Sequence, residues 1–271
     1  MRRETFHTPG ALTLDLRLPS GEITVESADG DETIVELDMT GASDEARELV
    51  EGARIELRQR GDGQEVIVDV QRKRRGLGLI FDRADFRLRV TAPHGADVEI
   101  SAASADANGR GRFGSLKVEV ASGDVRFAEL ASRVDLKSAS GDVDLERIGG
   151  EARVTTASGD IWIGSVEGEA TIRSASGDIA VDEAGSSVTV QTASGDQRVG
   201  SVTSGRVVMQ SASGDQTVGI RRGSGVHLDV RTMSGDTTSE LEIEDAPAGG
   251  DGPQIELRAT SMSGDIRILR A

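Results

Sequence analysis

Apolar and polar residues alternate along most of this chain, and a period of two is typical of β-strands with one buried face. In the block from Val134 to Ile148, alternating apolar residues stand on both sides of the segment Ser140-Gly141-Asp142. The next block, from Ala152 to Val166, repeats this pattern with residues of the same size class but different identity. The pattern predicts columns of stacked side chains, with one member from each block.

The tripeptide Ser-Gly-Asp marks each block. Successive copies begin 18, 18, 18, 18, 19, 21 and 29 residues apart. A degenerate copy, Ser104-Ala105-Asp106, begins 18 residues before the first copy. The copies are Ser122–Asp124, Ser140–Asp142, Ser158–Asp160, Ser176–Asp178, Ser194–Asp196, Ser213–Asp215, Ser234–Asp236 and Ser263–Asp265.

A repeat of ~18 residues is too short for two packed helices, but it suits two or three short strands joined by tight turns. Each repeat is therefore predicted to form one coil of an all-β, single-stranded parallel β-helix. Each coil should lie on the coil before it in the chain, at a strand spacing of ~4.8 Å that gives every strand a hydrogen-bonding partner on both sides.

The first 100 residues lack the tripeptide but are also rich in predicted strands. Ser20-Gly21-Glu22, followed by Ile23 and Val25, resembles a degenerate coil of the repeat. Residues 43–51 predict a short helix with Ser43 as its N-cap. We expect residues 1–100 to form a β-rich N-terminal cap continuous with the stack, and residues 101–271 to form the β-helix, with a loop at residues 246–253. The predicted strands of the cap are Leu12–Leu18, Glu22–Glu26, Thr33–Met39, Arg54–Arg58, Glu65–Val70, Phe86–Thr91 and Val98–Ser101.

The composition of the chain excludes several kinds of site and argues against one class of partner. The chain has 271 residues with no Cys, which excludes a disulfide framework, a thiolate zinc site and a cysteine nucleophile. Its net charge of −16 argues against nucleic acid as a partner, since both carry negative charge. The chain shows no signal-peptide core and no apolar stretch of ~18 residues, so as written it predicts a cytoplasmic location. A cell-surface location follows if a signal was removed.

The repeated Ser/Thr-Ala-Ser-Gly-Asp segment, followed by alternating Val and Ile, resembles the bacterial putative-adhesin family, a domain-of-unknown-function family of β-strand repeat proteins. The segment Leu18-Pro19-Ser20-Gly21-Glu22-Ile23 adds to the likeness, which covers nearly the whole chain. This resemblance implies a β-helix of the right-handed, pectin-lyase-like kind. It brings no catalytic residues and no cofactor.

The aspartates of the tripeptide are predicted to stack, one in each coil. In one interpretation they cap the turns by accepting hydrogen bonds from backbone N–H groups. In the other, divalent cations relieve the repulsion between neighbouring carboxylates, and calcium prefers several oxygen ligands. The capping interpretation is preferred, and the calcium candidates are Asp124, Asp142, Asp160, Asp178, Asp196 and Asp215.

A second column consists of hydroxyl residues that point inward near the corner. Small hydroxyls there can hydrogen-bond to the adjacent coil or to backbone carbonyls, which predicts a structural ladder. Its members are Ser138, Thr156, Ser174, Thr192, Ser211, Thr232 and Ser261.

Trp162, between Ile161 and Ile163, is predicted to face outward, with Asp144 and Ala180 as its column neighbours. An exposed Trp can anchor a protein partner or stack on a sugar ring. A loop folded over the ring is the structural alternative.

The one concentrated basic run is Arg72, Lys73, Arg74 and Arg75, with an apolar stretch after it that ends at Phe81. A segment of this kind can contact an anionic membrane or an acidic partner. It can also be a hairpin loop whose apolar residues pack into the cap, which is the preferred interpretation.

The function predicted from the sequence is that of a non-catalytic, adhesin-like interaction protein that presents a rigid acidic surface to a protein or glycan. End-to-end self-association through the terminal coils is part of this hypothesis. One alternative is carbohydrate binding or polysaccharide processing, and another is a membrane-proximal scaffold that uses residues 72–81. Catalysis is not favoured, because His7, His94 and His227 are scattered and lie in no recognisable motif.

Overall fold

The computed structural model describes residues 1–40, 44–70, 85–241 and 254–271, and these residues divide into two compact units. Unit 1 comprises Met1–Ala131 with Leu136–Ala139, and unit 2 comprises Ser132–Asp135 with Ser140–Ala271. Each unit is built from parallel strands stacked in coils, so the predicted all-β parallel β-helix is confirmed. The predicted boundary near residue 100 stays a prediction.

Unit 1 contains two strands that each run through a whole coil, β2 and β7, which pair in parallel from Thr13 with Asp97 to Glu26 with Arg110. Ser20 pairs with Ser104 and Glu22 with Asp106, so the degenerate coil predicted at Ser20-Gly21-Glu22 is confirmed. The elements of this unit are β1 (Arg2–His7), β2 (Leu12–Ala28), β3 (Glu32–Thr40), α1 (Asp44–Glu51), β4 (Arg54–Arg60), β5 (Gly63–Asp69), β6 (Asp85–Pro93), β7 (Asp97–Phe113), β8 (Leu116–Ser122) and β9 (Val125–Leu130).

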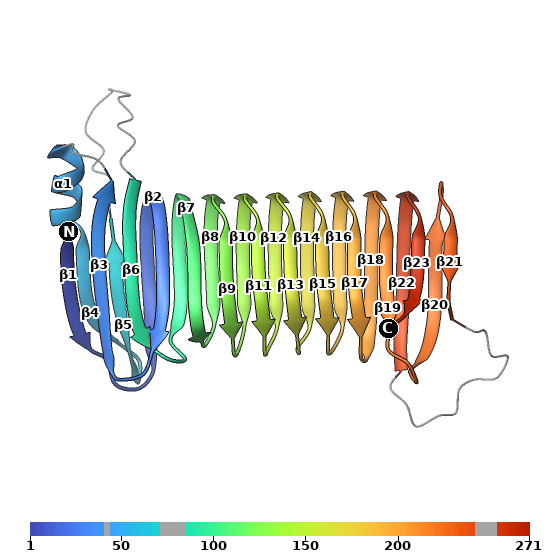
Figure 1. Ribbon diagram of the computed structural model, residues 1–271, viewed down its shortest axis with the longest axis horizontal. Helices are drawn as coiled ribbons and strands as arrows, with labels where there is room; N and C mark the ends of the chain where they lie inside the picture. The colour runs from blue at the N-terminus through green and yellow to red at the C-terminus, as the bar shows by residue number, and fades with distance from the viewer. Residues whose placement is uncertain (41–43, 71–84, 242–253) are drawn as a thin grey trace. The chain divides into compact units, whose positions relative to one another are not determined.

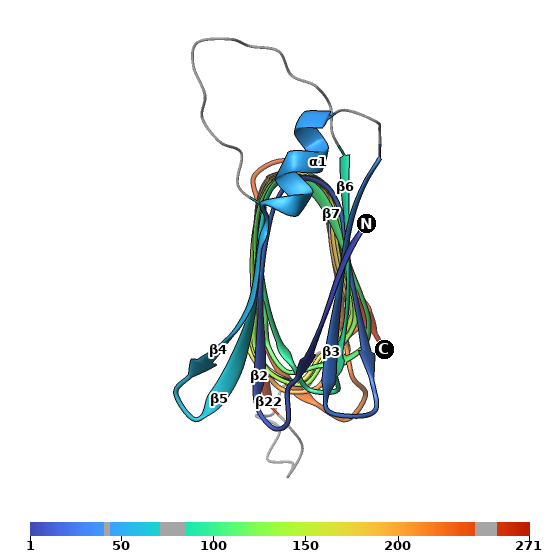
Figure 2. The ribbon, with the colours of Figure 1, turned by 90° about the vertical axis from the view of Figure 1, so that its left-hand side faces the viewer.

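On the side of β2 away from β7, the strand pairing changes from parallel to antiparallel beyond β5 and β6. The first half of β2 pairs in parallel with β5 and the second half with β6. Antiparallel strands then follow, with β4 on β5, β3 on β6, and β1 on β3 (Figure 2). These antiparallel strands lie within residues 1–100, the region predicted to form a β-rich cap. The helix α1 confirms the predicted helix, while its proposed N-cap, Ser43, lies outside the described residues.

Strand β1 was not predicted. Its side chains alternate between half-buried and exposed, and Phe6 is its one large apolar residue, so it carries little of the apolar alternation on which the prediction relied. The core of unit 1 includes an edge-to-face pair, Phe113 and Phe127, whose ring centroids are 5.6 Å apart. The ring of Phe127 occupies the space beside Gly109, where an added Cβ would lie 2.1 Å from Cδ1 of Phe127.

Unit 2 stacks coils of two strands each (Figure 1). The inward-facing residues of successive coils form buried aliphatic columns. Val143 pairs with Ile161 and Ile161 with Ile179, which confirms the predicted register of the repeat. The strands of unit 2 begin with β10 (Val134–Ser140), which contributes to both units, and continue with β11 (Val143–Ile148), β12 (Ala152–Ser158), β13 (Ile161–Val166), β14 (Ala170–Ser176), β15 (Ile179–Ala184), β16 (Val188–Ser194), β17 (Gln197–Val202), β18 (Gly205–Ser213), β19 (Gln216–Ile220), β20 (Gly225–Thr232), β21 (Thr237–Ser239), β22 (Gln254–Ser263) and β23 (Ile266–Arg270).

The last two coils of unit 2 do not follow the order of the chain, and here the predicted stacking was wrong. Strand β18 pairs with β22, and β22 pairs with β20 (Figure 1). Likewise β19 pairs with β23, and β23 pairs with β21. The coil of β22 and β23, last in sequence, therefore lies between the two coils that precede it. The long offset between the last two tripeptides belongs to this return of the chain.

Candidate functional site

The aspartate column forms a hydrogen-bonded ladder along the corner of the coils. In unit 2 each aspartate after Asp142 donates its backbone N–H to the carboxylate Oδ1 of the aspartate in the neighbouring coil, at 2.8–2.9 Å. Unit 1 has the same bond from Asp124 to Asp106, at 2.9 Å. These bonds support the capping interpretation, because one oxygen of each acceptor carboxylate is already used by a backbone amide. The ladder in unit 2 runs through Asp142, Asp160, Asp178, Asp196, Asp215, Asp265 and Asp236.

The glycine of the tripeptide is required at this corner for two reasons. Gly177 has φ +116°, a value that L side chains rarely adopt. A Cβ at Gly177 would also lie 2.2 Å from the carbonyl oxygen of Gly159 in the neighbouring coil. This position therefore requires glycine, because any side chain would clash with the backbone of the neighbouring coil.

The hydroxyl column is confirmed as a structural ladder. The hydroxyl of Thr156 donates a hydrogen bond to the carbonyl of Ser158 at 2.9 Å, and Ser174 and Thr192 make the equivalent bonds two residues along at 2.8 and 3.0 Å. Ser211 and Ser261 face each other at 3.2 Å between neighbouring coils. These buried hydroxyls are satisfied within the fold.

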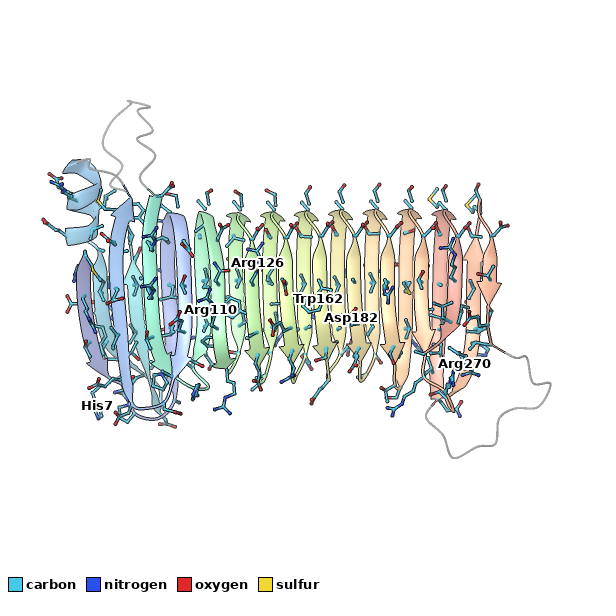
Figure 3. All side chains as sticks on the ribbon, viewed as in Figure 1. His7, Arg110, Arg126, Trp162, Asp182 and Arg270 are labelled. Atoms are coloured by element: carbon cyan, nitrogen blue, oxygen red, sulfur yellow. The ribbon has the colours of Figure 1, made fainter. Side chains whose placement is uncertain are left out.

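Trp162 faces outward on β13 beside Asp144 and Ala180, as predicted. It is 37% exposed, and its Nε1 donates a hydrogen bond of 3.0 Å to Oδ2 of Asp182 on the neighbouring coil (Figure 3). A Cβ added to Gly164 would lie 3.1 Å from Cη2 of the indole, so the ring lies over a position that has no side chain. The indole is therefore held against the sheet with its polar atom satisfied and part of its surface open.

Asp182 was not predicted as part of this site. Its position could have been found, because Asp182 follows Trp162 by one full repeat plus two positions, and two positions along a strand return to the same face. A long indole reaches such a diagonal neighbour, and the small residue at Gly164 leaves its path open.

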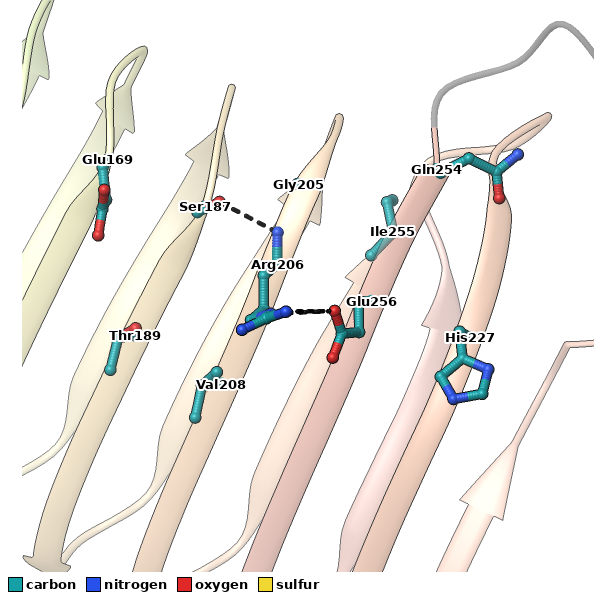
Figure 4. Close-up of a pocket in the computed structure, with 10 residues that line it drawn as sticks. All are labelled: Glu169, Ser187, Thr189, Gly205, Arg206, Val208, His227, Gln254, Ile255 and Glu256. Atoms are coloured by element: carbon teal, nitrogen blue, oxygen red, sulfur yellow. Dashed lines mark hydrogen bonds and ion pairs between the residues drawn. The ribbon is translucent and has the colours of Figure 1, made fainter.

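A second surface feature of unit 2 is a shallow groove of about 780 Å³ over β18, β22 and β20 (Figure 4). An ion pair crosses it, with Nη2 of Arg206 2.8 Å from Oε2 of Glu256. His227 stands next to Glu256 in the register of β20 and β22. This set was not predicted. Arg206, His227 and Glu256 each stand seven residues before a Ser-Gly-Asp copy and so share a column, but Arg206 and Glu256 become direct neighbours only through the exchanged order of the coils.

The remaining histidines of the prediction lie in unit 1, each beside an aspartate. Nδ1 of His7 is 3.5 Å from Oδ2 of Asp31, and Nε2 of His94 is 3.3 Å from Oδ1 of Asp29. The basic run Arg72, Lys73, Arg74 and Arg75 lies outside the described residues, so its membrane or partner role stays a prediction.

Shifted pKa values occur at residues of unit 1. The pKa of Arg17 is raised, chiefly by its hydrogen bond to the carboxylate of Asp15. The pKa of Asp38 is lowered, chiefly because the backbone amide of Met39 donates a hydrogen bond to its carboxylate. In the described part of the chain, no group of three or more acidic or His residues has the arrangement of a metal site.

The stacked coils, the corner ladder and the buried aliphatic columns define this chain as a parallel β-helix repeat protein. The chain belongs to the Toastrack DUF4097 family, whose sequence profile matches residues 11–269. No curated protein is similar enough to the chain to match it. The helix of the described residues, α1, has eight residues and is too short to cross a bilayer.

Solved structures of bacterial proteins resemble the chain over nearly its full length. A putative adhesin from Bacteroides fragilis is 11% identical, with 99% of this chain and 96% of that chain covered and a TM-score of 0.49. A putative adhesin from Parabacteroides merdae is 11% identical, with 98% and 94% covered and a TM-score of 0.40. A putative cell adhesion protein from Clostridium sporogenes is 12% identical, with 100% and 99% covered and a TM-score of 0.28.

Proposed function

We propose that this chain is a non-catalytic, adhesin-like binding protein that engages a neutral glycan on the outer sheet carrying Trp162. The observation that carries the proposal is the indole itself, which lies over Gly164, is fixed by Asp182, and is 37% exposed. A binding site on a repeat protein needs a local departure from the repeat. Trp162 supplies one, because Asp144 and Ala180 occupy the same column in the adjacent coils.

The chemistry around the ring suits a sugar. A flat aromatic surface packs against the C–H face of a pyranose, and carboxylates beside it accept hydrogen bonds from sugar hydroxyls. Asp144 and Asp182 supply these carboxylates on either side of the Trp162 strand. The net charge of −16 favours a neutral glycan over an acidic one.

A fixed ring also favours affinity. The hydrogen bond from Nε1 to Asp182 restricts the indole before a partner arrives, so little side-chain entropy is lost when a ligand stacks on it. By contrast, the Asp carboxylates of the corner ladder are used by backbone amides and repeat from coil to coil. This contrast supports a binding role for the Trp162 face and a structural role for the corner.

A second candidate ligand is a basic protein segment, since Lys or Arg can stack on an indole whose neighbours are carboxylates. Attraction to a chain of charge −16 would then weaken as salt rises, because surface charges are screened over ~8 Å at physiological ionic strength. Glycan stacking should change little with salt. Salt dependence therefore separates the two candidates.

Trp162 is the single Trp of the chain, so its fluorescence reports directly on this site. We would titrate the full chain with a panel of neutral oligosaccharides and with an oligolysine peptide, at low and high salt. Neutral glycan binding should change the emission and should be lost in Trp162→Ala when it is measured by calorimetry. Trp162→Phe should retain part of the affinity, because it keeps a stacking ring.

Arg198→Ala is the matched control, since Arg198 occupies the same column two coils away. It should bind as the unmodified chain does. Glycan binding that survives in Trp162→Ala would overturn the proposed site. Salt-sensitive binding of oligolysine without any glycan binding would replace the glycan with a basic partner.

A further inference from the structure

Among the residues that the structure describes, none covers one wall of the interior of the terminal coil of unit 2. On β20 the inward-facing residues are Val226, Leu228 and Val230, because they pair in register with the buried residues Ile255, Leu257 and Ala259 of β22. Val226 and Val230 are half-buried, and Leu228 is 38% exposed. In the described part of the chain β20 pairs with β22 alone, so its other edge presents unpaired N–H and C=O groups.

The opposite wall of the same coil is different. On β21 the inward positions are Thr237 and Ser239, whereas their register partners on β23 are the buried residues Ile266 and Ile268. Polar residues have replaced the apolar column on β21, as suits a strand that faces water. Strand β20 retains its apolar residues and carries no inward charge or proline, which are the usual protections of an exposed edge.

We propose that β20 is a self-association surface, and that its occupant is β20 of a second copy of this chain in antiparallel pairing. A two-fold axis normal to the sheet and midway between the two β20 strands, at the level of Leu228, places Leu228 opposite its own counterpart. The same axis places Val226 opposite Val230 of the partner, so the apolar residues of both copies meet on the inward face. The pairing is antiparallel, unlike the parallel pairing within the stack, but it continues the buried apolar column of each copy into its partner.

The outward face of β20 is complementary in the same register. His227 falls opposite Asp229 of the partner, and Asp229 falls opposite the partner's His227. An imidazole N–H can donate to a carboxylate in this arrangement, so the two residues form a polar pair directly across the strands. Arg258 and Arg231 also contact Asp229, at 3.1 Å each, so the acidic group is already held in place. A shift of the register by one residue would place apolar residues opposite polar ones.

The oligomeric state of the full chain tests this proposal. Sedimentation velocity over a wide concentration range should show a monomer–dimer equilibrium. Leu228→Lys should raise the apparent dissociation constant at least tenfold, because it places a charge on the inward edge. Thr217→Lys is the control, since Thr217 lies on the outward side of the interior strand β19 and should dimerise normally. Thermal unfolding of both variants checks that the coils remain folded.

Covalent capture gives a second measurement that does not depend on the Lys variant folding. The chain has no Cys, so Leu228→Cys introduces a single thiol at the proposed axis. Mild oxidation should link two copies rapidly, since directly opposed residues in antiparallel strands come within disulfide range. Met262→Cys, at a corner residue that is 58% exposed, should not link at the same protein concentration.

Three results would overturn the proposal. One is a chain that stays monomeric at high concentration and does not cross-link through Leu228→Cys. Another is a dimer that Leu228→Lys leaves unchanged, which would place the interface elsewhere. The third is a monomer that dimerises only when residues 242–253 are replaced by a short Gly-Ser linker, which would show that the chain covers its own end.

Discussion

The backbone amide of Asp265 donates a hydrogen bond of 2.9 Å to the carboxylate of Asp215, which lies 50 residues earlier in the chain. The amide of Asp236 in turn donates to Asp265, also at 2.9 Å. The corner ladder is thus continuous in space although the chain is out of order there. Because every corner has the same Ser-Gly-Asp chemistry, any coil can follow any other at this position.

Engineered disulfides test the order of the coils. Arg206 and Glu256 pair in register on neighbouring strands, at a spacing of ~4.8 Å that a disulfide can bridge. Arg206→Cys combined with Glu256→Cys should therefore cross-link within one chain. Arg206→Cys combined with His227→Cys should not, because those positions lie two strands apart at ~9.6 Å. Electrophoresis without reductant distinguishes the two outcomes, and a link between positions 206 and 227 would restore the sequential order.

The regular coils could be predicted because a single repeat carries the whole pattern. Gly177 and its equivalents fix the corner, and alternation fixes which residues point inward, so the columns around Trp162 followed without coordinates. The exchanged order of the last coils could not be predicted. Leu228 and Leu257 are equally acceptable as the column neighbour of Val207, so the local pattern does not say which coil comes next.

Gly177→Ala tests the corner glycine. The new Cβ would lie 2.2 Å from the carbonyl oxygen of Gly159, and the residue would keep an unfavourable φ of +116°. We expect a loss of about 3 kcal/mol or more in the free energy of unfolding. Gly30→Ala is a matched control, because Gly30 has φ +117° but open space around it, and it should lose about 1–2 kcal/mol. Equal losses in chemical denaturation would show that backbone conformation, rather than the contact with Gly159, determines the requirement.

Asp178 separates the capping and calcium interpretations of the corner column. Its Oδ1 accepts the backbone N–H of Asp196 at 2.8 Å, so Asp178→Ala should destabilise the chain by about 1 kcal/mol. Asp178→Asn keeps an acceptor oxygen and removes one charge from the column, so it should lose less. With capping alone, the Tm should be the same in excess calcium and in chelator. A calcium-dependent rise in Tm that Asp178→Asn diminishes would establish a metal role.

Two buried glutamines interrupt the aliphatic column that the second strand of each coil contributes to the interior. Gln197 and Gln216 are each 1% exposed and pair in register between Ile179 and Ile266. Their Nε2 groups donate to backbone carbonyls, but neither Oε1 has a hydrogen-bond partner. Since a buried, unpaired polar atom is unfavourable by about 1–3 kcal/mol, Gln197→Ile should raise the free energy of unfolding by about 1 kcal/mol. Gln191→Ile, on the outer face, should not.

Gln216 has a further consequence for the order of the coils. Its Nε2 donates to the carbonyl of Thr260 at 3.0 Å, which ties β19 to the returning strand β22 across the interior. Buried polar groups can select one arrangement at the expense of stability. We therefore expect Gln216→Ile to be more stable but less specific, with some cross-linking between Arg206→Cys and His227→Cys in that background. Strict retention of the link between positions 206 and 256 in Gln216→Ile would show that the length of the connecting chain, rather than Gln216, sets the order.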